Sequence, residues 1–542
     1  MKNILLSVAL LLMVFSLNAQ NVTITPSGIT PALAGTYPRL SYNAILALPS
    51  PVIGDQAYDT TFKCMRVYTG TQWICTYQNP ADPTPNITVF AQAGGPIADF
   101  GQGIAVDGAG NVYIVGSFRF TATFGGTTIN ANGGVDIYVA KYNSNGALQW
   151  VQSAGGSLGA ERGNGIAVDG SGNVYITGFY QGDGIFGSTT KTSLGNEDVF
   201  VAKYNSNGVI QWVQSAGGTG SDIGNGIALD ASGNVYVTGG YVGTATFGVG
   251  AAFSKTAVGN TDIFVAKYNT NGVIQWVRSA GGIGTVGLFG AIANGGNAIA
   301  VNANTGNVYV TGFYSGTAVF GVGFTKTAAG KSDIFLASYD TNGTIQWVDS
   351  YGGVTDDAGT GIALDGSGYL SITGFFAGTV NFSNIFLGNT SVSSASVSSD
   401  VFVAKYDVSG SFQWVRSGGG LDFDQARGIA VDGQGNVYIT GIFIGTASFS
   451  GKSVTATFSN TPTTFTDIFT AKYDKDGANQ WVKSNGGIDN DSGQGLAING
   501  ASGLYMVGQF GLTATFGSST ITAAGPGTSL GLFDVFVARF DN

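Results

Sequence analysis

One pattern, written seven times in succession, constrains the fold of this 542-residue chain more than any other feature. Its first half reads GIAVDGAGNVYIVG at Gly103, and related segments begin at Gly165, Gly226, Ala298, Gly361, Gly428 and Gly495. Its second half reads DIYVAKYNSNGALQW at Asp136 and recurs from Asp198, Asp262, Asp333, Asp400 and Asp467, with a shortened copy from Asp534. Consecutive copies of this length are the sequence signature of a solenoid or a propeller.

Each half of the repeat predicts a β-hairpin. Two short runs rich in β-branched and aromatic residues flank a turn of Asn, Asp, Ser and Gly, which is typical of hairpins. One repeat therefore predicts four antiparallel strands in up-and-down order. Runs such as IAV and VYIT are apolar throughout, which indicates that both faces of each sheet are covered by neighbours.

The two ends of the repeat region favour a closed ring over an open solenoid. The seventh copy lacks a fourth strand, whereas TVFAQAGG at residues 88–95, ahead of the first copy, is similar to the missing strand, with Val89 at the Trp position. Closure hides edge strands that would otherwise promote aggregation. We therefore expect an all-β, seven-bladed β-propeller of four-stranded blades over residues 87–542, closed by the N-terminal strand.

The repeat resembles the SBBP-type β-propeller repeats of exported bacterial proteins, and GIAVDGSGNVYITG is also loosely similar to NHL repeats. The resemblance extends from Asn86 to Asn542 and implies a propeller, but it implies no ligand, because a fold alone does not define a function. Two copies depart from the pattern. The segment from Ala298 to Gly312 has one additional residue, and YLSI replaces NVYI in the copy beginning at Gly361.

The residues ahead of the repeats predict three further segments. Residues 1–19 predict a signal peptide cleaved after Ala19, because the apolar stretch of 14 residues from Ile4 to Leu17 is shorter than the roughly 20 residues of a membrane-spanning helix. Residues 20–78 predict a small β module, and the Pro-rich residues 79–86 a linker. The chain is thus expected to be exported, and to be located extracellularly, at the cell surface or in the periplasm.

Two cysteines are present, and both fall in the predicted front module. Cys64 and Cys75 flank two β-rich runs joined by a turn around Gly70, so a hairpin brings them close together. An exported protein meets an oxidising compartment, which favours a disulfide between them. Two free buried thiols are the alternative.

Composition excludes several classes of function. The chain has no His, which excludes Ser or Cys catalytic triads and His-ligated zinc. With 22 Lys and Arg against 32 Asp and Glu, a formal charge of -10 and no basic run, nucleic acid is not an expected partner. No segment after the signal peptide is long and apolar enough to span a membrane. Oxygen-ligated calcium and carboxylate-based hydrolysis remain open.

Loop lengths indicate which face binds a ligand. Each Asp of the third strand precedes the Trp of the fourth by 14 residues, whereas the connection between second and third strands varies from 19 to 25 residues. In an up-and-down sheet the variable connections all emerge on one face, which we expect to bind a protein or glycan. Drift in unconstrained loops is the alternative.

Residues that recur in every copy are interpreted first as structural. The aspartates that open the third strands are expected to accept hydrogen bonds from backbone N–H groups of the adjoining loop. The repeated tryptophans are expected to pack between blades rather than to form a sugar platform. They are Trp150, Trp212, Trp276, Trp347, Trp414 and Trp481.

A second ring of acids is the candidate binding site. One acid lies four residues before the first strand's Gly in six copies, and Asn294 takes its place in the fourth. The six acids are Asp99, Glu161, Asp222, Asp357, Asp424 and Asp491. We hypothesise an acidic mouth that holds calcium or a cationic group; capping of the neighbouring Gly-rich turn is the alternative. No other cofactor, no metal ligand set and no catalytic residue is predicted.

These observations favour an exported binding or surface-interaction protein that is not an enzyme. A polysaccharide-acting enzyme using two carboxylates is the main alternative, but it should carry acids specific to one blade, whereas the acids here recur with the repeat. A purely structural envelope component is the other alternative.

Overall fold

The computed structural model describes residues 85–541 apart from 158, 285–293, 383–390, 458–464, 500–502 and 526–531, together with the backbone of six strands within residues 22–78. The chain divides into two compact units, Met1–Thr84 and Pro85–Asn542. The predicted signal peptide and most of the predicted linker lie outside the described residues, and both stay predictions.

The first unit contains two small sheets. One is the antiparallel hairpin of β1 (Val22–Thr25) and β2 (Gly28–Pro31). The other has the order β3-β4-β5-β6. Its strands are β3 (Arg39–Leu40), β4 (Gln56–Asp59), β5 (Cys64–Tyr68) and β6 (Trp73–Gln78).

The two cysteines lie on neighbouring strands of this second sheet, as the hairpin prediction required. The register places Gln78 opposite Cys64 and Arg66 opposite Cys75, with a bulge between Met65 and Arg66. The cysteines are therefore not at directly opposed positions. Their side chains are outside the described part of the structure, so the disulfide stays a prediction.

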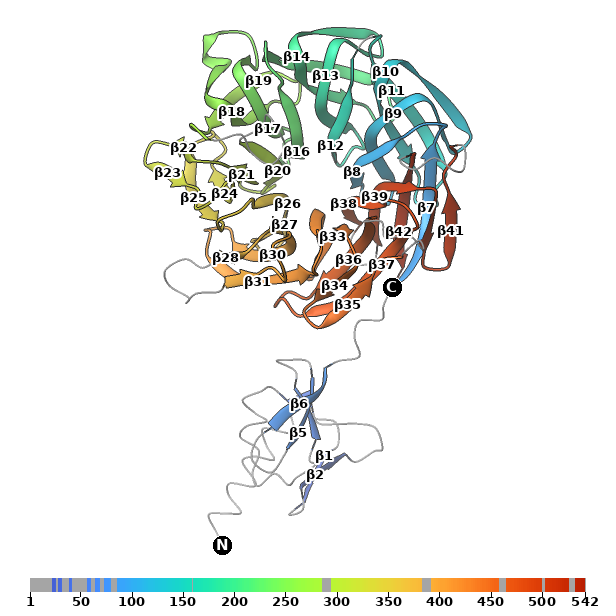
Figure 1. The fold of residues 1–542 in the computed structure, drawn as a ribbon, viewed down its shortest axis with the longest axis vertical. Coiled ribbons are helices and arrows are strands. Elements are labelled where there is room, and N and C mark those ends of the chain that lie inside the picture. Colours follow the sequence, from blue (N-terminus) through green and yellow to red (C-terminus); the bar gives the residue numbers. More distant parts are fainter. Residues whose placement is uncertain are drawn as a thin grey trace. The chain divides into compact units, whose positions relative to one another are not determined.

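In the second unit each repeat forms the two predicted hairpins, and the antiparallel strands of successive repeats are arranged around a centre (Figure 1). Hydrogen bonds between repeats join some of these strands into larger sheets. The first repeat forms β8 (Phe100–Val106), β9 (Val112–Phe124), β10 (Thr127–Tyr142) and β11 (Leu148–Gly155). The second forms β12 (Arg162–Val168), β13 (Val174–Phe186), β14 (Thr189–Tyr204) and β15 (Ile210–Gly218). The third forms β16 (Ile223–Leu229), β17 (Val235–Thr246), the short 3-10 helix η1 (Ala251–Phe253), β18 (Ser254–Tyr268) and β19 (Ile274–Ala280).

The later repeats have the same order, with extra short hairpins between the second and third strands. The fourth forms β20 (Gly295–Val301), β21 (Val308–Tyr314), β22 (Thr317–Gly321), β23 (Phe324–Thr327), β24 (Asp333–Tyr339) and β25 (Ile345–Tyr351). The fifth forms β26 (Ala358–Leu364), β27 (Tyr369–Phe376), β28 (Thr379–Asn381), β29 (Ser391–Ser393), β30 (Asp400–Asp407) and β31 (Phe412–Gly419).

The sixth repeat forms β32 (Gln425–Val431), β33 (Val437–Phe443), β34 (Thr446–Phe449), β35 (Lys452–Thr455), β36 (Asp467–Tyr473) and β37 (Asn479–Gly487). The seventh forms β38 (Ser492–Asn499), β39 (Gly503–Gly511), β40 (Thr513–Phe516), β41 (Ser519–Thr522) and β42 (Phe533–Asp541). Strand β7 (Asn86–Gly94), from the start of the unit, pairs antiparallel with β42, with Ala93 opposite Val535. It thus occupies the position of the missing fourth strand.

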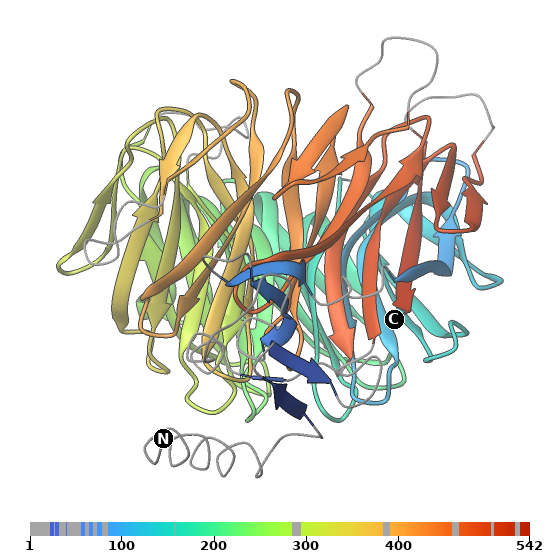
Figure 2. The ribbon, with the colours of Figure 1, turned by 90° about the horizontal axis from the view of Figure 1, so that it is seen from below.

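The first strand of each repeat lies nearest the centre of the unit (Figure 1), and each contacts the first strands of the repeats before and after it, including β38 with β8. Seen from the side in Figure 2, the strands run between two opposite faces. Turns between first and second and between third and fourth strands lie on one face, which we call the turn face. The other connections begin and end on the opposite face, which we call the loop face.

Packed side chains fill the space between successive sheets. One buried cluster joins Tyr113 and Val139 of the first repeat to Val174, Ile176 and Phe200 of the second. Further clusters join the following pairs of repeats. This explains why the strands are apolar on both faces, because each face covers a neighbour. The all-β propeller-like repeat architecture is therefore as predicted.

The variable connections differ from the loops expected from the sequence, because they fold as β-hairpins. In the second repeat, Asp183–Phe186 pairs with Thr189–Thr192. This hairpin also pairs with the fourth strand of the preceding repeat, where Gly155 lies opposite Ile185. The same contact recurs between β15 and β17, between β31 and β34, and between β37 and β40. In the first three repeats and the last two, part of the variable connection thus joins successive sheets.

Candidate functional site

The predicted acidic ring lies where the fourth strand of one repeat leads into the first strand of the next. Asp222, Asp357, Asp424 and Asp491 share one arrangement. In the case of Asp222, Oδ2 accepts a hydrogen bond of 2.7 Å from the N–H of Gly218, and Oδ1 accepts one of 3.0 Å from Val242. The other three accept from the glycine four residues earlier and from the residue 20 positions later in the same way.

Three positions of the ring vary this pattern. The Oδ1 of Asp99 accepts from the N–H of Arg119 at 3.2 Å. Asn294 accepts from Ser315 at 3.0 Å and donates to the carbonyl of Thr261 at 2.6 Å. Both carboxylate oxygens of Glu161 lack a hydrogen bond of good geometry, since its side chain is one methylene longer.

All seven side chains of this ring are fully buried, at 0% exposure. Their contacts agree with the capping alternative, because the hydrogen-bonded oxygens face backbone N–H groups rather than the solvent. Within the described residues, no three acidic or cysteine side chains lie close enough together to hold a metal ion. The calcium hypothesis is not tested by these contacts and stays a prediction.

The aspartates that open the third strands accept backbone N–H bonds from the adjoining connection, and this prediction is confirmed. Asp136 accepts from Asn132 at 2.8 Å and Asp198 from Leu194 at 3.1 Å. The corresponding bonds of the remaining five span 2.7 to 3.2 Å. These aspartates therefore fix the end of each variable connection.

Each third-strand aspartate except Asp262, which is followed by Asn294, lies close to the acid at the next junction. A Cβ on Gly217 would lie 2.5 Å from Cγ of Asp198 and 2.9 Å from Oδ2 of Asp222, so glycine is required between them. Burial raises the pKa of both carboxyls to about 6. At the first junction, burial raises the pKa of Asp99 to about 8, and the neighbouring Asp534 adds to this effect.

The tryptophans pack between successive repeats, as predicted. The indole N–H of Trp150 donates to the carbonyl of Ser206 in the next repeat at 3.0 Å. Gly208, in that same turn with φ of 78°, lies against the ring, where a Cβ would come within 2.7 Å of it. Trp212, Trp276 and Trp414 make the same bond to the next repeat.

The loop face carries exposed apolar side chains that sequence reasoning did not single out. Ile283, Val354, Leu421, Phe423 and Ile488 lie on the connections between consecutive repeats, from the third to the seventh, and are 41 to 80% exposed. Val397 precedes the third strand of the fifth repeat, next to Ser396, whose hydroxyl donates to Leu421. We call these six residues the apolar loop cluster. These residues could not be identified from the sequence, because the connections that carry them share no motif.

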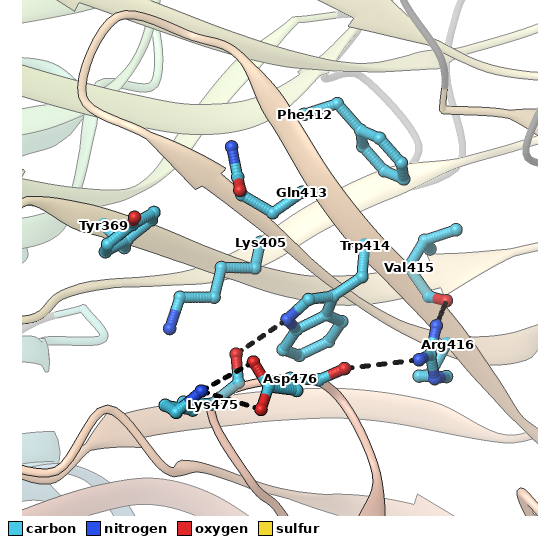
Figure 3. A pocket seen from close by; sticks show the side chains of 9 residues that line it. All are labelled: Tyr369, Lys405, Phe412, Gln413, Trp414, Val415, Arg416, Lys475 and Asp476. Carbon is cyan, nitrogen blue, oxygen red and sulfur yellow. Dashed lines mark hydrogen bonds and ion pairs between the residues drawn. The ribbon is translucent and has the colours of Figure 1, made fainter. Parts of the chain in front are cut away.

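A groove of about 540 Å³ opens on the turn face between the fifth and sixth repeats (Figure 3). Figure 3 shows Tyr369 and Lys405 on one side of the Trp414 ring and Arg416 on the other. Lys475 of the sixth repeat approaches from the opposite wall, paired with Asp476 at 2.7 Å. Three cationic side chains thus line one groove in a chain of net charge -10.

The groove coincides with the YLSI departure noted in the sequence. In the first four repeats and the sixth, a tyrosine follows the first turn, and its ring lies near the Trp of the same repeat, as in Tyr175 and Trp212 with centroids 6.2 Å apart. The fifth repeat has Ser371 at this position, and its tyrosine, Tyr369, lies two residues earlier, at the rim, with 36% exposure.

Sequence profiles of known families match the repeat region. The profile described as "Beta-propeller repeat" (SBBP) matches residues 90–117, 149–178, 211–239 and 414–441, and a profile described as a β-propeller "Domain of unknown function (DUF5122)" matches residues 123–148. Together with the four-stranded repeats around a common centre, these matches define the class of β-propeller repeat proteins. Within that class, four segments of the chain are similar to the SBBP-type β-propeller repeat.

Two curated relatives are 24% identical to this chain. One is an uncharacterised WD repeat-containing protein of Acanthamoeba polyphaga mimivirus, aligned over 76% of this chain and 35% of its own length. The other is a regulatory protein, FlaEY, of Caulobacter vibrioides, aligned over 36% of this chain and 20% of its own length. The chain thus spans about a third and a fifth of the length of these relatives.

Among solved structures, a protein of unknown function from Dyadobacter fermentans is similar with a TM-score of 0.32 and 9% identity, covering 70% of this chain and 94% of its own. A puromycin hydrolase is similar with a TM-score of 0.34 and 10% identity, covering 79% and 53%. In the described residues, the structure has no helix with the length and apolar character needed to cross a membrane.

Proposed function

We propose that this chain is an exported bacterial binding protein, without catalytic activity, built on a seven-bladed propeller that β7 closes. The contacts of all seven first strands with their neighbours, and the pairing of β7 with β42, support the closed ring. The apolar stretch of residues 1–19 supports export. The partner is a protein, bound on the loop face.

The observation that carries this proposal is the apolar loop cluster. Isolated exposed apolar residues are ordinary on protein surfaces, but a group of them on adjacent connections indicates an interaction surface. Leu421 is 74% exposed and Phe423 41% exposed on one connection, and Val354 is 80% exposed on the preceding one. Apolar side chains of this kind favour a protein partner over a glycan, since glycan recognition relies on polar groups and aromatic faces.

The buried acids argue against the alternative of a polysaccharide-acting enzyme. Such an enzyme needs two carboxyl groups that reach the substrate. Each junction acid instead lies inside the fold, and most accept backbone hydrogen bonds on both oxygens, as Asp357 and Asp424 do.

A binding assay with matched variants tests the proposal and separates it from a purely structural role. The purified mature chain is immobilised and exposed to fractionated bacterial envelope proteins. The test variant replaces four members of the cluster by serine, namely Val354→Ser, Leu421→Ser, Phe423→Ser and Ile488→Ser. The matched control replaces four exposed valines elsewhere, namely Val209→Ser, Val249→Ser, Val273→Ser and Val322→Ser.

We expect binding of at least one envelope protein to weaken by about tenfold or more in the test variant, because apolar anchors dominate interface energies. The control should bind as the unaltered chain does. Equal binding by both variants would remove the loop face as the recognition surface. Failure of the unaltered chain to bind any fraction would favour the structural role.

A further inference from the structure

At the groove between the fifth and sixth repeats, the side chains depart from the pattern of the other repeats. In the second repeat, Asp169 accepts hydrogen bonds from Asn173 at 2.7 Å and from the hydroxyl of Tyr175 at 3.2 Å. The first, third and sixth repeats have the same pair of donors. The fifth repeat has neither donor, since Tyr369 and Ser371 stand at these positions.

Lys405 takes over the neutralising role for the aspartate of the fifth repeat. Its Nζ lies 3.5 Å from Oδ2 of Asp365, and both side chains are about 95% buried. In the second repeat the equivalent Lys203 lies over the ring of Tyr175, with Nζ 5.0 Å from the centroid. Without a tyrosine at position 371, the ammonium of Lys405 lines an open groove, with Nζ 4.9 Å from the centroid of the Tyr369 ring.

The hydrogen bonds of this buried ammonium are long. A lysine ammonium has three N–H donors. The acceptors recorded for Lys405 among the described residues are Asp365 and the carbonyl of Gly435, each at 3.5 Å. A buried charged donor is stabilised by short hydrogen bonds. An oxygen acceptor of a ligand in the groove would supply such a bond to the ammonium of Lys405.

The other groups of the groove favour a particular kind of acceptor. Lys475 and Arg416 also line the groove. The Nζ of Lys475 donates to both carboxylate oxygens of Asp476, at 2.7 and 2.8 Å, and the guanidinium of Arg416 donates to the carbonyls of Gly477 and Asp476. Because Lys405 is paired with Asp365, the positive charge of the groove in excess of these ion pairs is that of Arg416. Tyr369 presents an exposed aromatic face and Gln413 an exposed amide. Cations attract a carboxylate, while an aromatic face and an amide suit the ring and hydroxyls of a sugar.

The geometry points to this groove as a second binding site, on the turn face, for a carboxylated saccharide such as an oligouronate. A sugar carboxylate is held between Lys405 and Lys475, and the sugar ring lies against Tyr369. The site is independent of the apolar loop cluster on the opposite face, so either site stands without the other.

A variant that restores the repeat pattern tests the site with little risk to folding. Tyr369→Asn with Ser371→Tyr gives the fifth repeat the residues of the second, so that the new ring fills the groove between Lys405 and Trp414. The repeats that already have these residues fold in the same way, so the melting temperature should be preserved or raised. Lys203→Gln, at the equivalent lysine of the second repeat, is the matched control.

The probes are a hexamer of galacturonic acid, a neutral glucose hexamer and tripolyphosphate, measured with the mature chain by calorimetry. We expect the uronate to bind, and its affinity to fall about tenfold or more in the double variant and in Lys475→Gln. The neutral hexamer should not bind, and Lys203→Gln should have no effect. Absence of uronate binding, unchanged affinity in the double variant, or equal binding of tripolyphosphate would each overturn the proposal.

Discussion

The second and fifth repeats pair their second and third strands in the same register but differ in the side chains that follow the first turn. Both have strands of the same register, with Gly178 opposite Phe200 in the second and Gly374 opposite Phe402 in the fifth. In the second, a tyrosine, a lysine and a tryptophan form one packed group, whereas in the fifth the tyrosine is displaced to the rim. The comparison shows that the scaffold tolerates a changed side-chain set without a change of register, which allows one repeat to acquire a site.

The largest loss of stability is expected when the ring that contains both repeats is opened. Deletion of residues 86–94 removes β7 and leaves β42 without its partner. We expect a loss of stability comparable to the whole free energy of unfolding of an ordinary domain, about 5 to 15 kcal/mol. Urea unfolding followed by tryptophan fluorescence measures it, and an unchanged midpoint would contradict the closed ring.

A smaller loss is expected when the second repeat is made to resemble the fifth. Tyr175→Ser removes a buried ring that packs near Trp212 and donates to Asp169. We expect a destabilisation of about 3 to 5 kcal/mol, because a cavity forms and the aspartate loses a donor. Thermal unfolding checks this, with Ser171→Ala as an exposed control. A loss below about 1 kcal/mol would mean that the tyrosine is not part of the packing.

The buried carboxyl groups should make the free energy of unfolding depend on pH. Burial raises the pKa of Asp424 to about 7 from an unfolded value of 3.8. The folded state therefore holds more protons than the unfolded state between these values, so the stabilisation is complete below about pH 4 and is lost as the pH rises through about 7. Unfolding at pH 5 and pH 8 should show lower stability at pH 8.

Asn294, which occupies the equivalent position in the fourth repeat, supplies matched variants for this pH effect. Asp424→Asn should reduce the slope of stability against pH by up to about 1.4 kcal/mol per unit between pH 5 and pH 7. Asn294→Asp should increase it in the same range. A slope that neither substitution changes would show that these carboxyls do not titrate in this range.

The smallest effect is expected for calcium. The junction acids are buried and face the backbone, so millimolar calcium should change the melting temperature by less than about 1 °C. An increase of several degrees that Asp222→Asn and Asp491→Asn reduce would instead support the acidic mouth. Magnesium at the same concentration serves as the control for ionic strength.

Much of the architecture was predictable because seven similar segments each predict the same local structure. The hairpins, the hydrogen bonds of Asp136 and its equivalents, and the packing of the tryptophans all follow from residue types at fixed spacing. The hairpin form of the variable connections did not, since its pairing depends on the preceding repeat, as with Gly155 and Ile185.

The groove was not predictable because it depends on departures from the pattern. The substitution at Ser371 is visible in the sequence, but its consequence depends on where Lys405, Trp414 and Lys475 meet in space. Lys405 and Trp414 face each other in one hairpin of the fifth repeat, whereas Lys475 belongs to the sixth. The burial of the junction acids was likewise open, since capping and cation binding use the same residue types.

The position of β7 has a consequence for the order of events during synthesis. This strand is made before every repeat, yet its partner β42 is made after all of them. The edge of β7 that pairs with β42 therefore has no partner until all the repeats have been synthesised. The final pairing joins segments from opposite ends of the repeat region. A chain interrupted before β42 would leave most of β7 without a partner, because β7 pairs with β9 only at Ala93 and Gly94. Such fragments could pair with other molecules through this edge and should aggregate.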